Sequence, residues 1–401
     1  MNSRIDSIVI WMIKLVVVVA LTTTASSPVE SQLICAEDGE VNVHCGRTPT
    51  PIVDPRGQLL IVFVQGEHVY LTTSNDFGHS FSSPVQVNSQ LEKIYANGEN
   101  RPKIALGTNG EIFISWSKVT KGRFNGDIRF TRSLDAGVTF EPVRTVNDDG
   151  LLTTHRFEVM QIADNGNLFL AWIDKRDKDA AIYAAVSLDN GLSFEPNFRV
   201  AARSCQCCRL AAAPAEDGVA LFWRHIFDQN TRDHAFSIVG ESDNKPEFSQ
   251  ATVDDWKIDA CPHHGPAMAV ADSGDDRVHH VTWFTAGAKR QGIFYGYIDA
   301  ATRNATGIRE ISTAPSASHP HILVDVDTSI WIVWKEFDGT TTHVYSSTSR
   351  NSGKDWEVRK LQASTGNNSD HPLLINSKEG VLLSWLTEDE GYRLIPLRSV
   401  K

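Results

Sequence analysis

The sequence predicts an all-β fold, a β-propeller built from four-stranded antiparallel blades. One observation is a unit that recurs seven times, with 52 to 56 residues between successive starts. Another is that each unit holds short apolar strands separated by turns rich in Gly, Asn and Asp, which is typical of antiparallel sheet. The third is that no segment keeps a helical apolar period over about ten residues. We expect seven blades, with six as the alternative if the weakest unit is not a blade. The units begin at or near Arg47, Arg101, Arg156, Cys208, His263, His319 and His371.

The composition is that of a globular protein rich in aromatic residues. Hydrophobic residues make up 41% and charged residues 22% of the 401 positions, which excludes disorder and coiled-coil architectures. Ten Trp and 18 Phe stand against four Met, which favours a β-rich core filled by rigid side chains. The formal net charge of −11 argues against a nucleic-acid binder, because such proteins present a basic surface to phosphates.

Residues 1–26 have the organisation of a secretory signal peptide. Arg4 and Lys14 are basic, an apolar run follows at 15–21, and small residues come next. The run is short for a membrane span, which favours cleavage, and an uncleaved anchor is the alternative. We expect a secreted or periplasmic protein with no stable membrane span after signal cleavage. The rest of the chain, 33–401, is expected to form one propeller domain.

The seventh unit, 371–401, has room for only three strands. We expect its fourth strand to come from residues 40–44, so that strands from both ends of the chain close the ring. Closure of this kind removes open sheet edges, which otherwise invite aggregation. Cys35 and Cys45 flank this segment, and an oxidising compartment favours a disulfide between them that would staple the closing strand.

A second motif recurs between the third and fourth strands of the units. It reads Ser-x-Asp-x-Gly-x-Ser/Thr-Phe in three units and is degenerate in a fourth. The Asp side chain can accept hydrogen bonds from turn amides, the Gly permits positive φ, and the closing aromatic packs between sheets. The motif is therefore expected to be structural rather than catalytic. Its Asp and Gly positions are Asp76, Gly78, Asp135, Gly137, Asp189, Gly191 and, in the degenerate copy, Gly353.

These turns resemble the Asp-box repeats of the sialidase-like (BNR) propeller superfamily, and the resemblance covers residues 45–400. A narrower resemblance, through a Cys-x-Cys-Cys motif at 205–208 and a Cys-Pro pair at 261–262, is to a secreted bacterial group often labelled exo-alpha-sialidase. The resemblance implies a sialidase site with three arginines that clamp a carboxylate and a tyrosine nucleophile. The expected acid/base Asp has no match, because the loop at 65–68 is short and lacks Asp. The residues that could fill the other roles are Arg47, Arg101, Arg156 and Tyr392.

Propeller topology gathers the unit starts on one face, and there the sequence places an unusual set of cysteines and histidines. Thiolates and imidazoles together suit Cu(I) or Zn(II). Disulfides, for example from Cys261 to the Cys-x-Cys-Cys motif, are one alternative, and redox-active thiols are another. Sulfur separations near 2 Å would indicate disulfides, whereas separations of roughly 3.5–4 Å around one centre would indicate a metal. The candidate ligands are Cys205, Cys207, Cys208, Cys261, His263 and His264.

The leading functional expectation is a secreted, sialidase-like propeller that binds a transition metal, copper first and zinc second, at this Cys-, His- and Arg-rich face. One alternative is an exo-sialidase or another glycan-active hydrolase. The other is a non-catalytic propeller that binds a protein partner. The sequence favours a binding protein over an enzyme, since two key positions of a sialidase are unmatched or missing. Metal, glycan and protein are thus the expected partners.

Overall fold

The computed structural model describes Cys35 and residues 39–216, 218–241, 246–273, 276–366 and 368–397. The expected signal peptide at 1–26 lies outside these residues. Within the described part of the chain, no helix combines the length and apolarity needed to cross a membrane.

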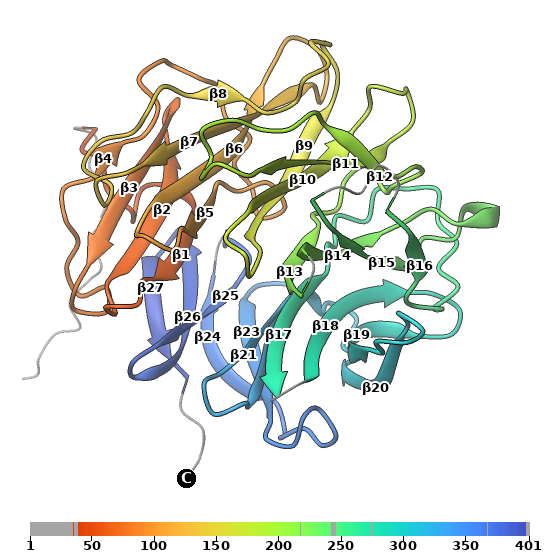
Figure 1. Ribbon diagram of the computed structural model, residues 1–401. Coiled ribbons are helices and arrows are strands. Elements are labelled where there is room, and N and C mark those ends of the chain that lie inside the picture. Colours follow the sequence, from red (N-terminus) through yellow and green to blue (C-terminus); the bar gives the residue numbers. More distant parts are fainter. Residues whose placement is uncertain are drawn as a thin grey trace, which may run out of the picture. The chain divides into compact units, whose positions relative to one another are not determined.

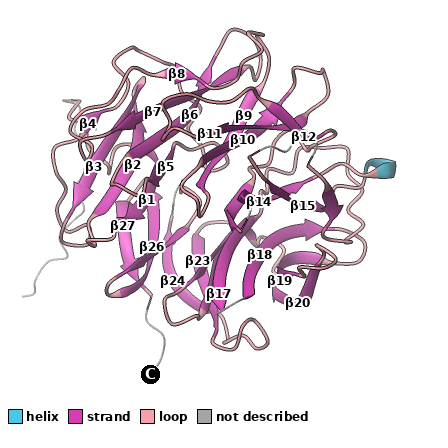
Figure 2. Cartoon of the chain, viewed as in Figure 1, coloured by secondary structure: helices cyan, strands magenta, loops and turns pink. Residues whose placement is uncertain are grey.

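The unit Leu33–Lys401 is all-β, with seven antiparallel sheets that follow one another along the chain (Figures 1 and 2). The first three sheets consist of β1 (Arg47–Val53), β2 (Leu59–Gln65), β3 (His68–Ser74) and β4 (Val85–Gln86); β5 (Lys103–Leu106), β6 (Ile112–Val119), β7 (Gly126–Ser133) and β8 (Arg144–Thr145); and β9 (His155–Ile162), β10 (Leu168–Asp174), β11 (Ala181–Ser187) and β12 (Phe198–Ala201). The next two consist of β13 (Ala211–Ala215), β14 (Gly218–Arg224), β15 (His234–Val239) and β16 (Phe248–Gln250); and β17 (Ala267–Ser273), β18 (Asp276–Ala286), β19 (Gln291–Ile298) and β20 (Ala305–Ser312). The last two consist of β21 (Ser318–Val324), β22 (Ile330–Phe337), β23 (Thr342–Ser349) and β24 (Lys360–Thr365); and β25 (Leu373–Ser377), β26 (Gly380–Thr387) and β27 (Gly391–Pro396).

The sheets form a closed ring. The first strand of each sheet contacts the first strand of the next, and β25 of the last sheet contacts β1 of the first. Figure 1 shows the sheets arranged as blades around a common axis. The predicted seven-bladed β-propeller is therefore confirmed, and the six-bladed alternative is excluded.

A buried tryptophan in the second strand of six sheets fills the space between neighbouring blades. Four of the six indole N–H groups donate to a carboxylate at 2.7–3.0 Å, and an arginine pairs with each of these carboxylates. A buried carboxylate needs such partners, because an unpaired buried charge is costly. The tryptophans are Trp116, Trp172, Trp223, Trp283, Trp334 and Trp385, and the carboxylates belong to Glu92, Asp174, Asp254 and Glu336.

The Asp-box turns have the local geometry that the motif predicts. In the first copy the Asp76 carboxylate accepts a hydrogen bond from the backbone N–H of Ser80 at 2.9 Å, and the Gly78 N–H donates to Ser74 Oγ at 2.8 Å. Hydrogen bonds to its carboxylate from the Ser80 hydroxyl, the Ser80 N–H and the Ser74 hydroxyl lower the pKa of Asp76 to about 2. The two backbone N–H bonds recur in the copies built on Asp135, Asp189 and Asn351. The glycines have φ values of 75–88°, namely Gly78, Gly137, Gly191 and Gly353.

The seventh sheet differs from the expectation, since residues 40–44 do not add a strand to it. Asn42 Oδ1 accepts the N–H groups of both His44 and Cys45, so this segment forms a turn instead of an extended ladder. Val43 still packs into the apolar cluster shared by the first and last sheets. The predicted Cys35–Cys45 disulfide is present and anchors this turn. The ring is thus closed by side-chain packing between β25 and β1.

Candidate metal centre

The loop between β12 and β13 places three thiols between the third and fourth sheets. The Ser204 N–H donates to the carbonyl oxygen of Ala180 at 2.7 Å, and the Cys205 N–H donates to that of Arg224 at 3.0 Å. These bonds fix the loop to both sheets, and its side chains join the hydrophobic cluster that the two sheets share. The three thiols belong to Cys205, Cys207 and Cys208.

The three sulfur atoms converge on one point. Cys205 Sγ lies 3.7 Å from Cys207 Sγ and 3.7 Å from Cys208 Sγ, and all three atoms lie within 4.8 Å of one another. A disulfide has a sulfur separation of about 2.05 Å, so these are free thiols. Three thiolates at about 2.3 Å from a tetrahedral metal would stand about 3.8 Å apart. Two of the three observed separations therefore match the spacing of thiolates around one ion.

The sulfur cluster is buried in apolar surroundings. The three cysteines are 1%, 4% and 2% exposed, and Phe157 and Trp223 belong to the same hydrophobic cluster. Charge is supplied on one side by Arg232, whose Nη1 donates to Cys205 Sγ at 3.4 Å. The buried Arg224 and Arg156 also act electrostatically on the cysteines. These guanidinium groups can offset the negative charge of thiolates.

The arrangement favours one thiolate and two thiols when no ion is bound. Hydrogen bonds from the Cys207 and Cys208 thiols, with the charges of Arg224 and Arg232, lower the pKa of Cys205. Donating to Cys205 raises the pKa of Cys207, and burial raises the pKa of Cys208. A metal that binds all three sulfurs would have to displace the two remaining protons.

The other three predicted ligands lie outside this cluster. Cys261 is exposed, and its Sγ lies 4.0 Å from Nε2 of Gln206. His263 is exposed as well. His264 is half-buried, and its ring packs 4.2 Å from that of Phe284, measured between centroids. The structure thus brings together the Cys-x-Cys-Cys motif and places the residues of the fifth unit beside it.

A second group of potential ligands surrounds the carboxylate of Glu99 at the axis. Glu99 Oε2 accepts the backbone N–H groups of Arg209 and Gly265 at 2.8 and 3.0 Å, and Oε1 accepts Arg209 Nη1 at 2.6 Å. The Nδ1 atoms of His319 and His371 each lie 3.6 Å from Oε1. Burial would raise the pKa of Glu99, but Arg209 and His319 outweigh it and lower the pKa to about 2. Because strong donors already occupy this carboxylate, its role is to tie blades together across the axis.

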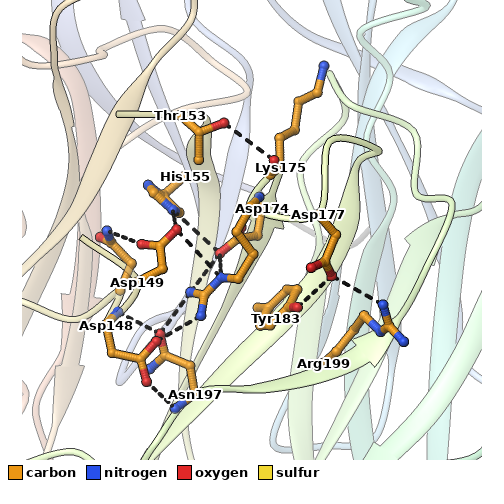
Figure 3. Close-up of polar contacts among 12 residues, drawn as sticks. Asp148, Asp149, Thr153, His155, Asp174, Lys175, Asp177, Tyr183, Asn197 and Arg199 are labelled. Carbon is orange, nitrogen blue, oxygen red and sulfur yellow. Dashed lines mark hydrogen bonds and ion pairs between the residues drawn. The ribbon is translucent and has the colours of Figure 1, made fainter. Parts of the chain in front are cut away.

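Figure 3 shows a third cluster, where β9 begins and β10 ends. His155 Nε2 lies 3.1 Å from Asp149 and 3.6 Å from Asp174, and its Nδ1 faces the carbonyl oxygen of Gly126 at 2.7 Å. Burial would raise the pKa of Asp149, but the charges of His155 and Arg176 outweigh it, so the pKa is lowered. Asp174 is also one of the tryptophan-binding carboxylates. Because Nδ1 faces the carbonyl oxygen of Gly126, Nε2 is the ring nitrogen that faces the two carboxylates.

The residues expected for a sialidase are held by contacts within the protein. Arg47 is exposed and donates to the carbonyl oxygen of Gly66. Arg101 is buried, forms an ion pair with Asp370 at 2.7 Å and donates to the carbonyl oxygen of Pro49. Both guanidinium groups are thus engaged by the protein itself.

The other two sialidase candidates are buried. The Arg156 guanidinium lies 3.9 Å over the ring of Tyr95. The Tyr392 hydroxyl lies 2.9 Å from that of Ser384, and burial raises the pKa of Tyr392. A phenol in this environment is a poor nucleophile, because its ionised form is disfavoured.

Sequence reasoning missed two residues that the site depends on. Arg232 and Glu99 lie in connecting loops, and nothing in their local sequence marks them. Arg232 reaches Cys205 across 27 positions, and Glu99 reaches Arg209 across 110. Such contacts depend on how blades are placed in space, which only the closed ring defines.

The comparisons with known proteins support the fold. An ulvan lyase, a polysaccharide lyase, aligns with a TM-score of 0.53 and 12% identity over 88% of this chain and 94% of its own. A Dyadobacter fermentans protein of unknown function aligns with a TM-score of 0.49 and 13% identity over 77% and 95% of the two chains. The NanB sialidase of Streptococcus pneumoniae aligns with a TM-score of 0.49 and 9% identity over 77% and 68%. No known family and no curated protein matches the sequence. At these identities the likeness to the ulvan lyase shows a shared propeller fold and nothing about activity.

Proposed function

We propose that this propeller is an extracytoplasmic metal-binding protein that holds one soft transition-metal ion at Cys205, Cys207 and Cys208. The observation that carries the proposal is the convergence of three buried sulfurs, with Cys205 Sγ 3.7 Å from each of the other two and all three within 4.8 Å of one another. Soft thiolate ligands select Cu(I) and Zn(II) over harder ions. The extracytoplasmic location rests on the signal-like segment 1–26 and on the Cys35–Cys45 disulfide.

Copper(I) suits the site better than zinc. Among the described residues, the cluster of potential ligands at this point consists of the three cysteines alone. Structural zinc sites take four protein ligands, so zinc here would need a fourth ligand from solution. Copper(I) is satisfied by three thiolates. Its complex would carry a charge of −2, for which the surrounding guanidinium groups of Arg156, Arg224 and Arg232 provide compensation.

The metal site is better supported than a glycan-active site. The arginines that would clamp a sugar carboxylate are engaged in separate contacts, and the candidate nucleophile Tyr392 is buried. A shared fold with a polysaccharide lyase does not carry its activity, because one propeller scaffold hosts unrelated functions.

Metal analysis of two cysteine variants tests the proposal. The protein, purified under reducing conditions and loaded with Cu(I), is expected to hold about one equivalent, with copper–sulfur distances of about 2.3 Å by X-ray absorption. Cys207→Ser removes a ligand and should lose tight binding. Cys261→Ser is the matched control, since it removes a neighbouring exposed thiol outside the cluster. The proposal fails if the wild type retains less than about 0.2 equivalents, or if Cys207→Ser retains as much copper as the wild type.

A further inference from the structure

An exposed cysteine stands directly over the segment that carries the buried thiols. Cys261 Sγ lies 4.0 Å from Nε2 of Gln206, the residue between Cys205 and Cys207. Gln206 is itself exposed, and its Oε1 accepts a hydrogen bond from Lys175 Nζ at 3.2 Å. The chain therefore offers one thiol to solvent and three beneath it, separated by a single exposed loop.

Arg232 connects the loop of Cys261 to the buried sulfurs. Its Nε donates to the carbonyl oxygen of Ile258 at 2.7 Å, and its Nη2 lies 3.9 Å from Asp259. Its Nη1 donates to Cys205 Sγ at 3.4 Å. One guanidinium thus holds both the segment leading to Cys261 and the sulfur that carries the negative charge.

A pocket of about 290 Å³ opens beside this loop, and Gln206 and Arg232 contribute to its wall. Four cationic side chains and one carboxylate contribute to its wall, so its charge is positive. A positive pocket raises the local concentration of anions and speeds their arrival. Cu(I) bound by two or more chloride or thiolate ligands is such an anion. The charged lining residues are Lys175, Lys178, Asp179, Arg203 and Arg232.

We propose that Cys261 is a transient ligand that takes Cu(I) from an anionic complex in this pocket and passes it to Cys205, Cys207 and Cys208. This role rests on the proposed metal-binding function and adds its route of loading. The alternatives, a permanent fourth ligand and a redox partner of the buried thiols, are separated by the test below.

The transfer is a ligand exchange without change of oxidation state. The Cys261 thiol releases its proton to solvent as its sulfur bonds to Cu(I) and displaces one ligand of the donor complex. The Cys205 thiolate then bonds to the same ion. As the Cys207 and Cys208 thiols lose their protons to solvent and bond in turn, the remaining ligands of the donor complex leave, the bond to Cys261 breaks and that sulfur takes a proton back. Copper is Cu(I) at the start and at the end.

The rate of loading, measured apart from the final occupancy, tests this role. Cu(I) supplied as its coloured bis-bicinchoninate complex, which is anionic, is mixed with the whole protein, and loss of the complex is followed by stopped flow. Cys261→Ser should slow uptake on the order of tenfold, because a ligand held beside the site acts at a high effective concentration. The final occupancy should stay at one equivalent. His263→Gln, an exposed neighbour, controls for disturbance of the loop and should load at the wild-type rate.

Three results would overturn the proposed role, each in a distinguishable way. Uptake by Cys261→Ser at the wild-type rate would show that the thiol is not on the route, while metal binding itself stands. A loss of final occupancy in Cys261→Ser would make Cys261 a permanent ligand. A disulfide between Cys261 and a buried cysteine, found by mass spectrometry after loading, would indicate redox chemistry. Failure of the wild type to take up copper would instead reject the metal-binding function.

Discussion

Replacing Arg232 by Met should weaken Cu(I) binding, because this guanidinium faces the sulfur cluster from a distance of 3.4 Å. At that distance one unit charge gains about 5 kcal/mol from Arg232 at an effective dielectric constant of about 20. The complex carries one more negative charge than the thiolate and two thiols of the free site, so this interaction grows on binding. Screening and relaxation reduce the net effect to that of a charged hydrogen bond, about 1.5–3 kcal/mol. The expected loss of affinity is therefore roughly 10- to 150-fold.

Competition with a coloured Cu(I) chelator at fixed pH measures this affinity. Arg203→Met is the matched control, because it removes one positive charge from the same pocket without a contact to sulfur; Arg203 pairs instead with the exposed Asp228 at 3.1 Å. Arg232→Lys should recover part of the lost affinity by restoring the charge. If Arg232→Met lowers the affinity less than about threefold, or no more than Arg203→Met does, the electrostatic reasoning is wrong.

Two further predictions concern pH and packing. Affinity for Cu(I) should fall about a hundredfold per pH unit on acidification near neutral pH, because the pKa values of Cys207 and Cys208 are raised and two protons must leave for each ion bound. Isothermal titration in several buffers measures the number of protons released and hence the slope of affinity against pH. A slope near zero would contradict the assigned protonation. Trp172→Phe should destabilise the fold by about 1–3 kcal/mol more than Trp223→Phe. The indole N–H of Trp172 donates to buried Asp174, whereas that of Trp223 has no hydrogen-bond partner among the described residues. Urea unfolding of both variants measures the difference, and equal losses of stability would show that this hydrogen bond contributes nothing.

Features repeated along the chain could be read from the sequence. The 52–56-residue period required one supersecondary unit per repeat, and the Asp-box pattern indicated where the third strand turns into the fourth in four of the sheets. Both depend on contacts within a few residues, such as that between Asp135 and Thr139. The prediction for residues 40–44 was wrong because it followed from the missing fourth strand of the last unit and not from a property of this segment. Asn42 uses its side chain to turn the chain, a competition that the pattern does not show.

The candidate site was only partly predictable, because it combines contacts within one loop with packing between blades. Cys205, Cys207 and Cys208 are neighbours in sequence, so one loop suffices to bring their sulfurs together. Cys261 and His264 were placed beside them by blade adjacency, and adjacency sets the blade but not the direction of a side chain. The stacking of His264 on Phe284 and the exposure of Cys261 depend on packing between the fourth, fifth and sixth units.

Glu99 has a consequence for the mechanics of the ring. It precedes β5 of the second sheet but accepts hydrogen bonds from Arg209 and Gly265, which precede the fourth and fifth sheets. A force applied to one of these blades is therefore transmitted to the other two. The junction between β25 and β1 has no shared strand to resist the same load. Under a stretching force or during proteolysis, the ring should therefore open first between the last and the first blade. The blades near the three thiols should separate last.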